Sequence, residues 1–266
     1  MAELQICLLG SFQVCWDFAP VASAAWRNPW ALRLLKLVLA QRPDPVPAAE
    51  AVRLIGSGIR PGDIAPAIES VSRVLQPAAA LVADTDGITF RPGSACWIDV
   101  DMLMAHCQNA IAAANRGEMF PAILAFQEAD ALYQGDFLEE VQDAWALPQR
   151  RRLQSIYTDI LERLAEGHAV LARYQDAVGF CHKALAHDRL KESTYQRMMV
   201  YYYYLGDLAG ASEAYQVCRY ALQDAGRQVS AETVDLWRQL SQCELPLPPG
   251  VTAAPAQQSR RHRPRV

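Results

Sequence analysis

The sequence predicts a mainly α-helical protein with an N-terminal α+β winged helix-turn-helix domain, residues 1–98, and an all-α domain of tetratricopeptide-like (TPR-like) repeats, residues 99–245. Two observations predict this order. Short segments with strand or helix periodicity alternate in the first part. Helical periodicity with a 34-residue repeat dominates the second part. Residues 246–266 are rich in Ala, Pro, Gln and Arg, and we expect them to form a disordered basic tail.

The winged-helix prediction begins with a strand over residues 4–17, bent at Gly10–Ser11. Apolar residues at helical spacing predict a first helix over residues 30–39, which Pro43 and Pro45 end. A second short helix is expected over residues 48–55, before a glycine-rich turn.

A third helix is expected from Pro61 to Leu75, with Asp63 placed to cap its start. The segment from Leu81 to Phe90 then predicts a β-hairpin with Asp86–Gly87 in its turn. Strands, three short helices and a hairpin form the order of a winged helix-turn-helix.

The second domain is predicted from an internal repeat. Six positions of one helix pair recur 34 residues later in the next pair. They are Leu161, Leu164, His168, Leu171, Ala177 and Ala184, which become Tyr195, Met198, Tyr202, Leu205, Ala211 and Cys218. An earlier and weaker copy contains Gly117, Met119, Ala122, Phe126 and Ala129. This period is typical of TPR helix pairs and says little about the ligand.

Composition and charge exclude several classes of protein. A formal net charge of −4 over 266 residues argues against a surface that binds polyanions everywhere. Four arginines lie in the tail (Arg260, Arg261, Arg263 and Arg265), so the rest of the chain is still more acidic. No apolar run reaches the length of a membrane span. Seven scattered cysteines without a CxxC pair favour reduced thiols in the cytoplasm over disulfides or a metal site.

Several short motifs occur in a characteristic order along the chain. They are Leu8–Val14, Trp30–Leu35, Trp97–Asp101, Leu132–Leu138, Ala144–Trp145, Arg150–Leu153 and Val229–Thr233. In this order the sequence resembles the bacterial transcriptional activator domain (BTAD) proteins of the antibiotic-regulatory (SARP) type. The resemblance implies a cytoplasmic transcription regulator without cofactor or membrane contact. It also implies binding to promoter DNA, often as two molecules, and contact with RNA polymerase. No enzyme signature is found, and catalysis is not expected.

The resemblance also implies which residues meet DNA. The helix over residues 63–75 would enter the major groove, and the hairpin over residues 81–90 would be the wing. The candidate DNA contacts are Ser70, Ser72, Arg73, Arg60 and Arg91. Family members usually carry several arginines in this helix, whereas residues 57–98 here contain three cations and four acids. DNA affinity is therefore expected to be weakened.

Two alternatives remain open at this point. Arg73 could pair with Glu69 four residues earlier on the helix instead of binding DNA. The chain could also be an interaction module that no longer reads DNA and binds a partner protein or a small effector on its helical repeats. The candidate groove for such a ligand contains Tyr201, Tyr202, Tyr204 and Tyr215.

Overall fold

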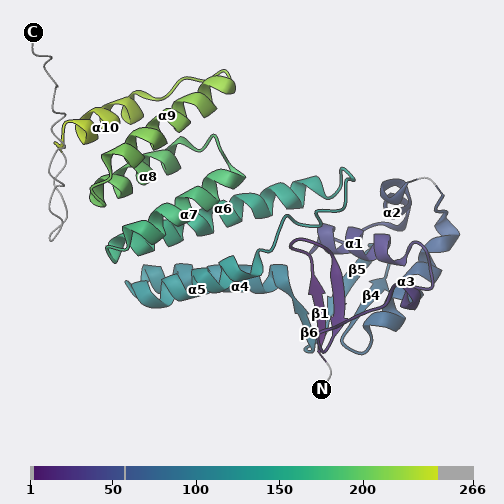
Figure 1. The fold of residues 1–266 in the computed structure, drawn as a ribbon. Helices are drawn as coiled ribbons and strands as arrows, with labels where there is room; N and C mark the ends of the chain where they lie inside the picture. Colours follow the sequence, from purple (N-terminus) through teal and green to yellow (C-terminus); the bar gives the residue numbers. More distant parts are fainter. Residues whose placement is uncertain (1–2, 57, 245–266) are drawn as a thin grey trace, which may run out of the picture. The chain divides into compact units, whose positions relative to one another are not determined.

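The computed structural model describes residues 3–56 and 58–244 (Figure 1). Contacts divide the chain into two compact units, Met1–Ile160 and Leu161–Val266. The expected basic tail, residues 246–266, lies outside the described residues. None of the described helices is long and apolar enough to cross a membrane.

The first unit opens with a four-stranded sheet. Its strands lie in the order β3 (Ala19–Pro20), β2 (Gln13–Trp16), β1 (Leu4–Cys7) and β6 (Cys96–Ile98). β1 is antiparallel to β2 and parallel to β6. Strand β6 thus returns the chain to the N-terminal strand after the whole winged helix has been formed.

The prediction of a single strand over residues 4–17 is wrong. Gly10 has φ +98°, a conformation that L side chains rarely adopt, and the chain reverses around it into a β1–β2 hairpin. Leu4 consequently pairs with Trp16 across the hairpin. The Gly10–Ser11 signal marked a turn and not a bend within one strand.

The remaining elements of the winged helix follow in the expected order (Figure 1). They are η1 (Ser23–Ala25), α1 (Ala31–Gln41), α2 (Ala48–Ile55), η2 (Pro61–Asp63), α3 (Ile64–Leu75), β4 (Ala79–Ala83) and β5 (Ile88–Pro92). Leu34 and Leu35 of α1 and Val71 and Leu75 of α3 are fully buried. The indole N–H of Trp16 donates to the carbonyl of Val74 at 3.0 Å, which ties the sheet to the end of α3.

Helices α4 (Asp99–Asn115) and α5 (Met119–Leu132) form an antiparallel pair within the first unit. Gly117 makes the turn between them with φ +76°. Helix α6 (Leu147–Val170) contains the division between the units, at Ile160. This division by contacts therefore differs from the domain boundary expected at residue 98. The boundary at residue 98 stays a prediction.

The second unit continues with α7 (Tyr174–His187), α8 (Glu192–Tyr204), α9 (Leu208–Asp224) and α10 (Ala231–Ser241). Ala177 and Ala211, equivalent positions of the 34-residue repeat, are both completely buried. Small residues at these positions let paired helices approach closely. The TPR-like architecture predicted from the repeat is confirmed, as is the mainly helical fold class.

Candidate nucleic-acid interface

Helix α3 buries one side against α1 and exposes the other to solvent. Its buried side contains Ala67, Val71 and Leu75. Its exposed residues are Ala65, Pro66, Glu69 and Arg73. A partner that meets α3 therefore meets two small apolar residues and one pair of opposite charges.

The two serines predicted to contact DNA flank the buried side of α3. Ser70 is only 3% exposed, and its hydroxyl oxygen accepts a hydrogen bond from the backbone N–H of Asn28 at 3.3 Å. Ser72 is half-buried, and its hydroxyl donates to the carbonyl of Leu81 in the hairpin at 3.4 Å. Both hydroxyls thus hold α3 in place within the winged helix, and Ser70 does not reach the surface.

Arg73 reaches the surface but is not free. Its guanidinium lies 3.0 Å from the carboxylate of Glu69, one helical turn earlier. The side chains are 47% and 76% exposed, so solvent screens the pair and it adds little to stability. Its main consequence is electrostatic, because an acid lies directly beside the cation of the predicted reading helix.

The β4–β5 hairpin also contains an arginine paired with an acid. Arg91 on β5 lies 3.6 Å from the carboxylate of Asp84 at the start of the turn. The same carboxylate accepts hydrogen bonds from the backbone N–H groups of Asp86 and Gly87. The turn is thus built around an acid that also partly neutralises the arginine of the wing.

Arg60 precedes α3, and its surroundings correct one expectation about the helix start. Asp63 was expected to cap α3, but its side chain makes no capping hydrogen bond to that helix. Its carboxylate instead accepts from the backbone N–H of Arg60 at 2.7 Å. The reason is that residues 61–63 form the 3-10 turn η2. Asp63 ends this turn, and its carboxylate caps the start of the turn at Arg60 instead of the start of α3.

Three further cations of the winged helix are paired with acids outside it. Each forms an ion pair with an acid that follows residue 98 in the sequence. The pairs are Arg33–Asp143 at 2.6 Å, Lys36–Glu140 at 2.6 Å and Arg42–Asp101 at 2.8 Å. These ion pairs hold the start of the helical region against the winged helix within the first unit, and they leave each of the three cations beside an acid.

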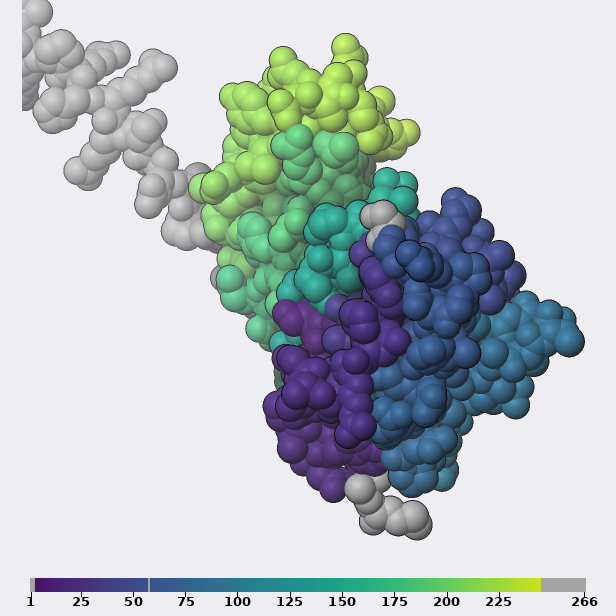
Figure 2. Space-filling model, turned by 90° about the vertical axis from the view of Figure 1, so that its right-hand side faces the viewer, coloured from purple at the N-terminus to yellow at the C-terminus, as the bar shows by residue number. Residues whose placement is uncertain are grey.

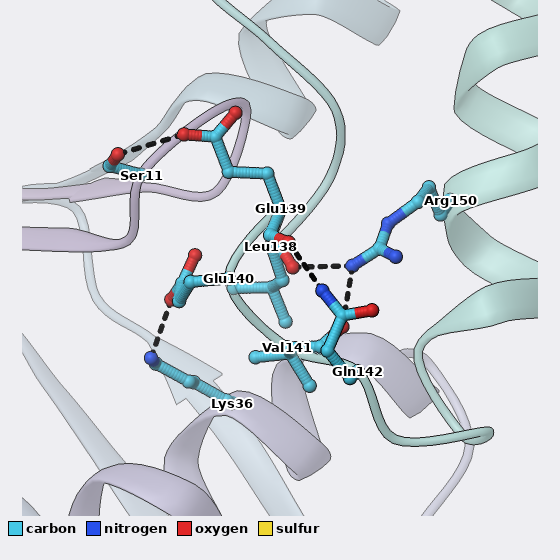
Figure 3. A network of polar contacts seen from close by, with 8 residues as sticks. All are labelled: Ser11, Lys36, Leu138, Glu139, Glu140, Val141, Gln142 and Arg150. Atoms are coloured by element: carbon cyan, nitrogen blue, oxygen red, sulfur yellow. Dashed lines mark hydrogen bonds and ion pairs between the residues drawn. The ribbon is translucent and has the colours of Figure 1, made fainter.

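The acids Glu139 and Glu140 belong to a loop, residues 136–143, within the segment that links α5 to α6 (Figure 3). Arg150, in the first turns of α6, donates to the carbonyls of Phe137, Leu138 and Val141 in this loop. Ser11 in the β1–β2 turn donates to Glu139 at 2.9 Å. This loop therefore joins the winged helix to the helices that follow it.

The four tyrosines predicted to line a ligand groove do not all reach the surface. Tyr201 and Tyr215 lie in the core of the second unit, and burial raises the pKa of Tyr201 to about 12. Tyr202 is half-buried, with its hydroxyl 3.2 Å from Nε2 of His182. The ring of Tyr204, also half-buried, packs against the ring of Tyr174. These aromatic side chains mainly fill space between helices.

Sequence reasoning missed Arg27, an exposed arginine just before α1. It carries no motif signal, and only the contact between its neighbour Asn28 and Ser70 brings it to the side of α3. The pairing of Arg73 with Glu69 was foreseeable from the spacing of four residues. The long-range pairs of Arg33, Lys36 and Arg42 were not.

Among solved structures, one is similar to nearly the whole chain and supports the fold. EmbR of Mycobacterium tuberculosis, in complex with a low-affinity phosphopeptide, is similar over 93% of this chain and 67% of its own, with a TM-score of 0.77 and 18% identity. The TPR2B domain of yeast Sti1, in complex with pHsp70, covers 54% of this chain and 98% of its own at 17% identity, with a TM-score of 0.39. The Sgt2 TPR domain of Aspergillus fumigatus covers 58% and 91% at 15% identity, with a TM-score of 0.38.

Comparison with curated proteins gives no match. The family model described as the bacterial transcriptional activator domain matches residues 98–241, which is more than half of the chain. Proteins of this kind are regulatory and not enzymes. The match and the fold together confirm the resemblance found in the sequence, and the chain belongs to the bacterial transcriptional activator domain family.

Proposed function

We propose that this protein is a cytoplasmic transcription regulator of the SARP type that binds promoter DNA weakly through its winged helix. Helix α3 would enter the major groove and the β4–β5 hairpin would contact the backbone. Membership of the family and the fold shared with EmbR support the regulatory role. Figure 2 looks onto one face of the molecule, on which the blue atoms of the α2–α3 region reach the surface.

The low affinity rests on one observation, the pairing of Arg73 with Glu69 on the exposed side of α3. Phosphate contacts by cations supply most of the sequence-independent affinity for DNA. Glu69 both repels phosphate and competes for the guanidinium of Arg73. The Arg91–Asp84 pair has the same effect at the wing.

The test is fluorescence anisotropy with labelled promoter fragments at about 50 mM salt. We expect Glu69→Gln to strengthen binding several-fold, because it removes a negative charge and releases Arg73. Arg73→Ala should weaken it. The matched control is Glu118→Gln, which removes another exposed acid from its pair with Arg116 in the α4–α5 turn, away from α3.

Absence of any complex between the wild-type chain and genomic fragments would refute the proposal. A Glu69→Gln variant that binds no better than Glu118→Gln would refute the assignment of α3 as the reading helix. Each variant replaces one exposed carboxylate by a carboxamide of nearly the same shape, so neither is expected to disturb folding.

A second candidate function is binding of a protein partner on the helical region. The observation that favours it is the exposure of three large apolar side chains on α4 and α5. Ile111 is 50% exposed, Phe120 62% and Leu124 60%. Purified bacterial RNA polymerase is the first partner to test. Loss of its binding in a Phe120→Ser, Leu124→Ser variant would support this function, and unchanged binding or none would refute it.

A further inference from the structure

Most cations of the winged helix already have an acid partner. Arg33, Lys36, Arg42, Arg53, Arg73 and Arg91 each form an ion pair. Within the described part of this domain two other arginines, Arg27 and Arg60, form no ion pair with an acid. Both are exposed. These two arginines are therefore the side chains that can offer a full positive charge to a ligand.

The fold brings the segments that carry Arg27 and Arg60 to α3. The backbone N–H of Asn28, next to Arg27, donates to the hydroxyl of Ser70 on α3. The carboxamide oxygen of Asn28 accepts from the backbone N–H of Trp30 at 2.8 Å, which fixes this turn.

Trp30 then connects the turn to the loop before α3. Its ring packs so closely on Gly58 that a Cβ there would lie 3.1 Å from the ring atom Cη2. Arg60 follows Gly58 by two residues and leads directly into η2 and α3. Arg27 and Arg60 thus stem from two adjacent segments that both contact the α3 region, and neither belongs to the exposed side of α3 itself.

We propose that Arg27 and Arg60 bind backbone phosphates of DNA on the flanks of α3 and supply most of the electrostatic affinity of the winged helix. A guanidinium offers a planar fork of N–H donors that matches a phosphate in two parallel hydrogen bonds. The exposed side of α3 cannot provide this anchoring, because its single cation lies beside Glu69.

This division of roles separates phosphate anchoring from base reading. Phosphate contacts fix the register of a protein on the duplex, whereas side chains that meet base edges carry the sequence information. The exposed side of α3 would then face base edges, where the guanidinium of Arg73 can donate to guanine. The inference rests on the proposed DNA-binding function and assigns its phosphate-binding residues.

The test measures anisotropy of a labelled mixed-sequence duplex with the full chain over a series of salt concentrations. Each phosphate contact contributes about 0.9 to the slope of log affinity against log salt. Arg27→Ala and Arg60→Ala are each expected to lower this slope by about 0.9 and to weaken binding about 3- to 10-fold at about 50 mM salt. The double variant should lose close to 2 units of slope.

The matched control is Arg116→Ala, an exposed arginine of the α4–α5 turn that is paired with Glu118. This variant also removes one positive charge, but at a site distant from α3, and it should leave the slope unchanged. Arg27→Lys keeps the charge and should retain the slope, which separates an electrostatic contact from an effect on folding.

Three results would overturn the inference. If the wild-type chain binds DNA and the double variant keeps its slope, the arginines are not phosphate contacts, although the proposed function stands. If Arg116→Ala loses as much slope as Arg27→Ala or Arg60→Ala, the effect reflects overall charge. If the wild-type chain binds no duplex even at about 50 mM salt, the proposed function and the inference fail together.

Discussion

The carboxylate of Asp99 accepts a 2.6 Å hydrogen bond from the backbone N–H of Leu8, 91 residues earlier in the chain. The same oxygen accepts from the N–H of Leu9, and the other oxygen accepts from Val100. Asp99 begins α4 and is only 3% exposed. One buried side chain therefore connects the end of strand β1 to the first helix of the BTAD region.

Replacing Asp99 by alanine should be strongly destabilising. The change leaves the buried N–H groups of Leu8 and Leu9 without acceptors, and each such group costs about 1–3 kcal/mol. We expect the free energy of unfolding to fall by about 2–5 kcal/mol, as measured by urea denaturation. The control is Asp101→Ala on the same helix, which removes only the half-exposed pair with Arg42 and should cost at most about 1 kcal/mol. Equal losses in the two variants would contradict the role of Asp99.

Asp99 should also make stability depend on pH. Burial raises its pKa to about 6, against the opposing effect of the three backbone donors, from an ordinary value of 3.8. The native state then binds this proton more tightly than the unfolded state, so stability should fall as pH rises from about 4 to about 6 and level off above. For this residue the change is on the order of 3 kcal/mol. Asp99→Asn cannot ionise, so the stability of the wild type relative to this variant should decrease over the same interval. A difference that is constant or rises with pH would contradict the prediction.

Arg150 should not be replaceable by lysine. Its guanidinium donates to three carbonyls of the loop over residues 136–143, and a lysine ammonium is a point charge without this planar fork. We expect Arg150→Lys to lower the free energy of unfolding by about 1–3 kcal/mol. The adjacent Arg151 is exposed, so Arg151→Lys is the matched control and should change stability by less than about 0.5 kcal/mol. Similar values for both variants would show that the loop does not depend on the fork.

The fold could be predicted from the sequence where its signals are local. The bounds of α2, the end of α3 at Leu75, the hairpin that follows it and the repeat of Ala177 as Ala211 all follow from periodicity or turn chemistry, whereas the 3-10 turn before α3 does not. Strand β6 could not be predicted, because three residues with no alternation of their own become a strand only through pairing with β1. The split of the first expected strand depended on the backbone conformation of Gly10.

The candidate site was less predictable than the fold. The spacing of Glu69 and Arg73 foretold their ion pair, but Ser70 lies at the edge of the apolar side of α3, where sequence alone does not decide burial. The partners of Arg33 and Lys36 lie more than 100 residues away. Charge counting along the chain therefore cannot tell a cation that holds two parts of the protein together from one that is available to DNA.

The turn of the wing provides a final prediction. Gly87 has φ +143°, and a Cβ there would lie 2.7 Å from both the carbonyl carbon and the carbonyl oxygen of Val46. Val46 and Ile88 exchange backbone hydrogen bonds, so the hairpin cannot move away without losing them. Gly87→Ala should therefore combine backbone strain with a clash and lower stability by about 2–4 kcal/mol. Gly62→Ala is the control, because a Cβ at Gly62 meets nothing within 4 Å. Thermal unfolding of the two variants decides the point: a Gly87→Ala protein as stable as Gly62→Ala would mean that the wing is not held against Val46.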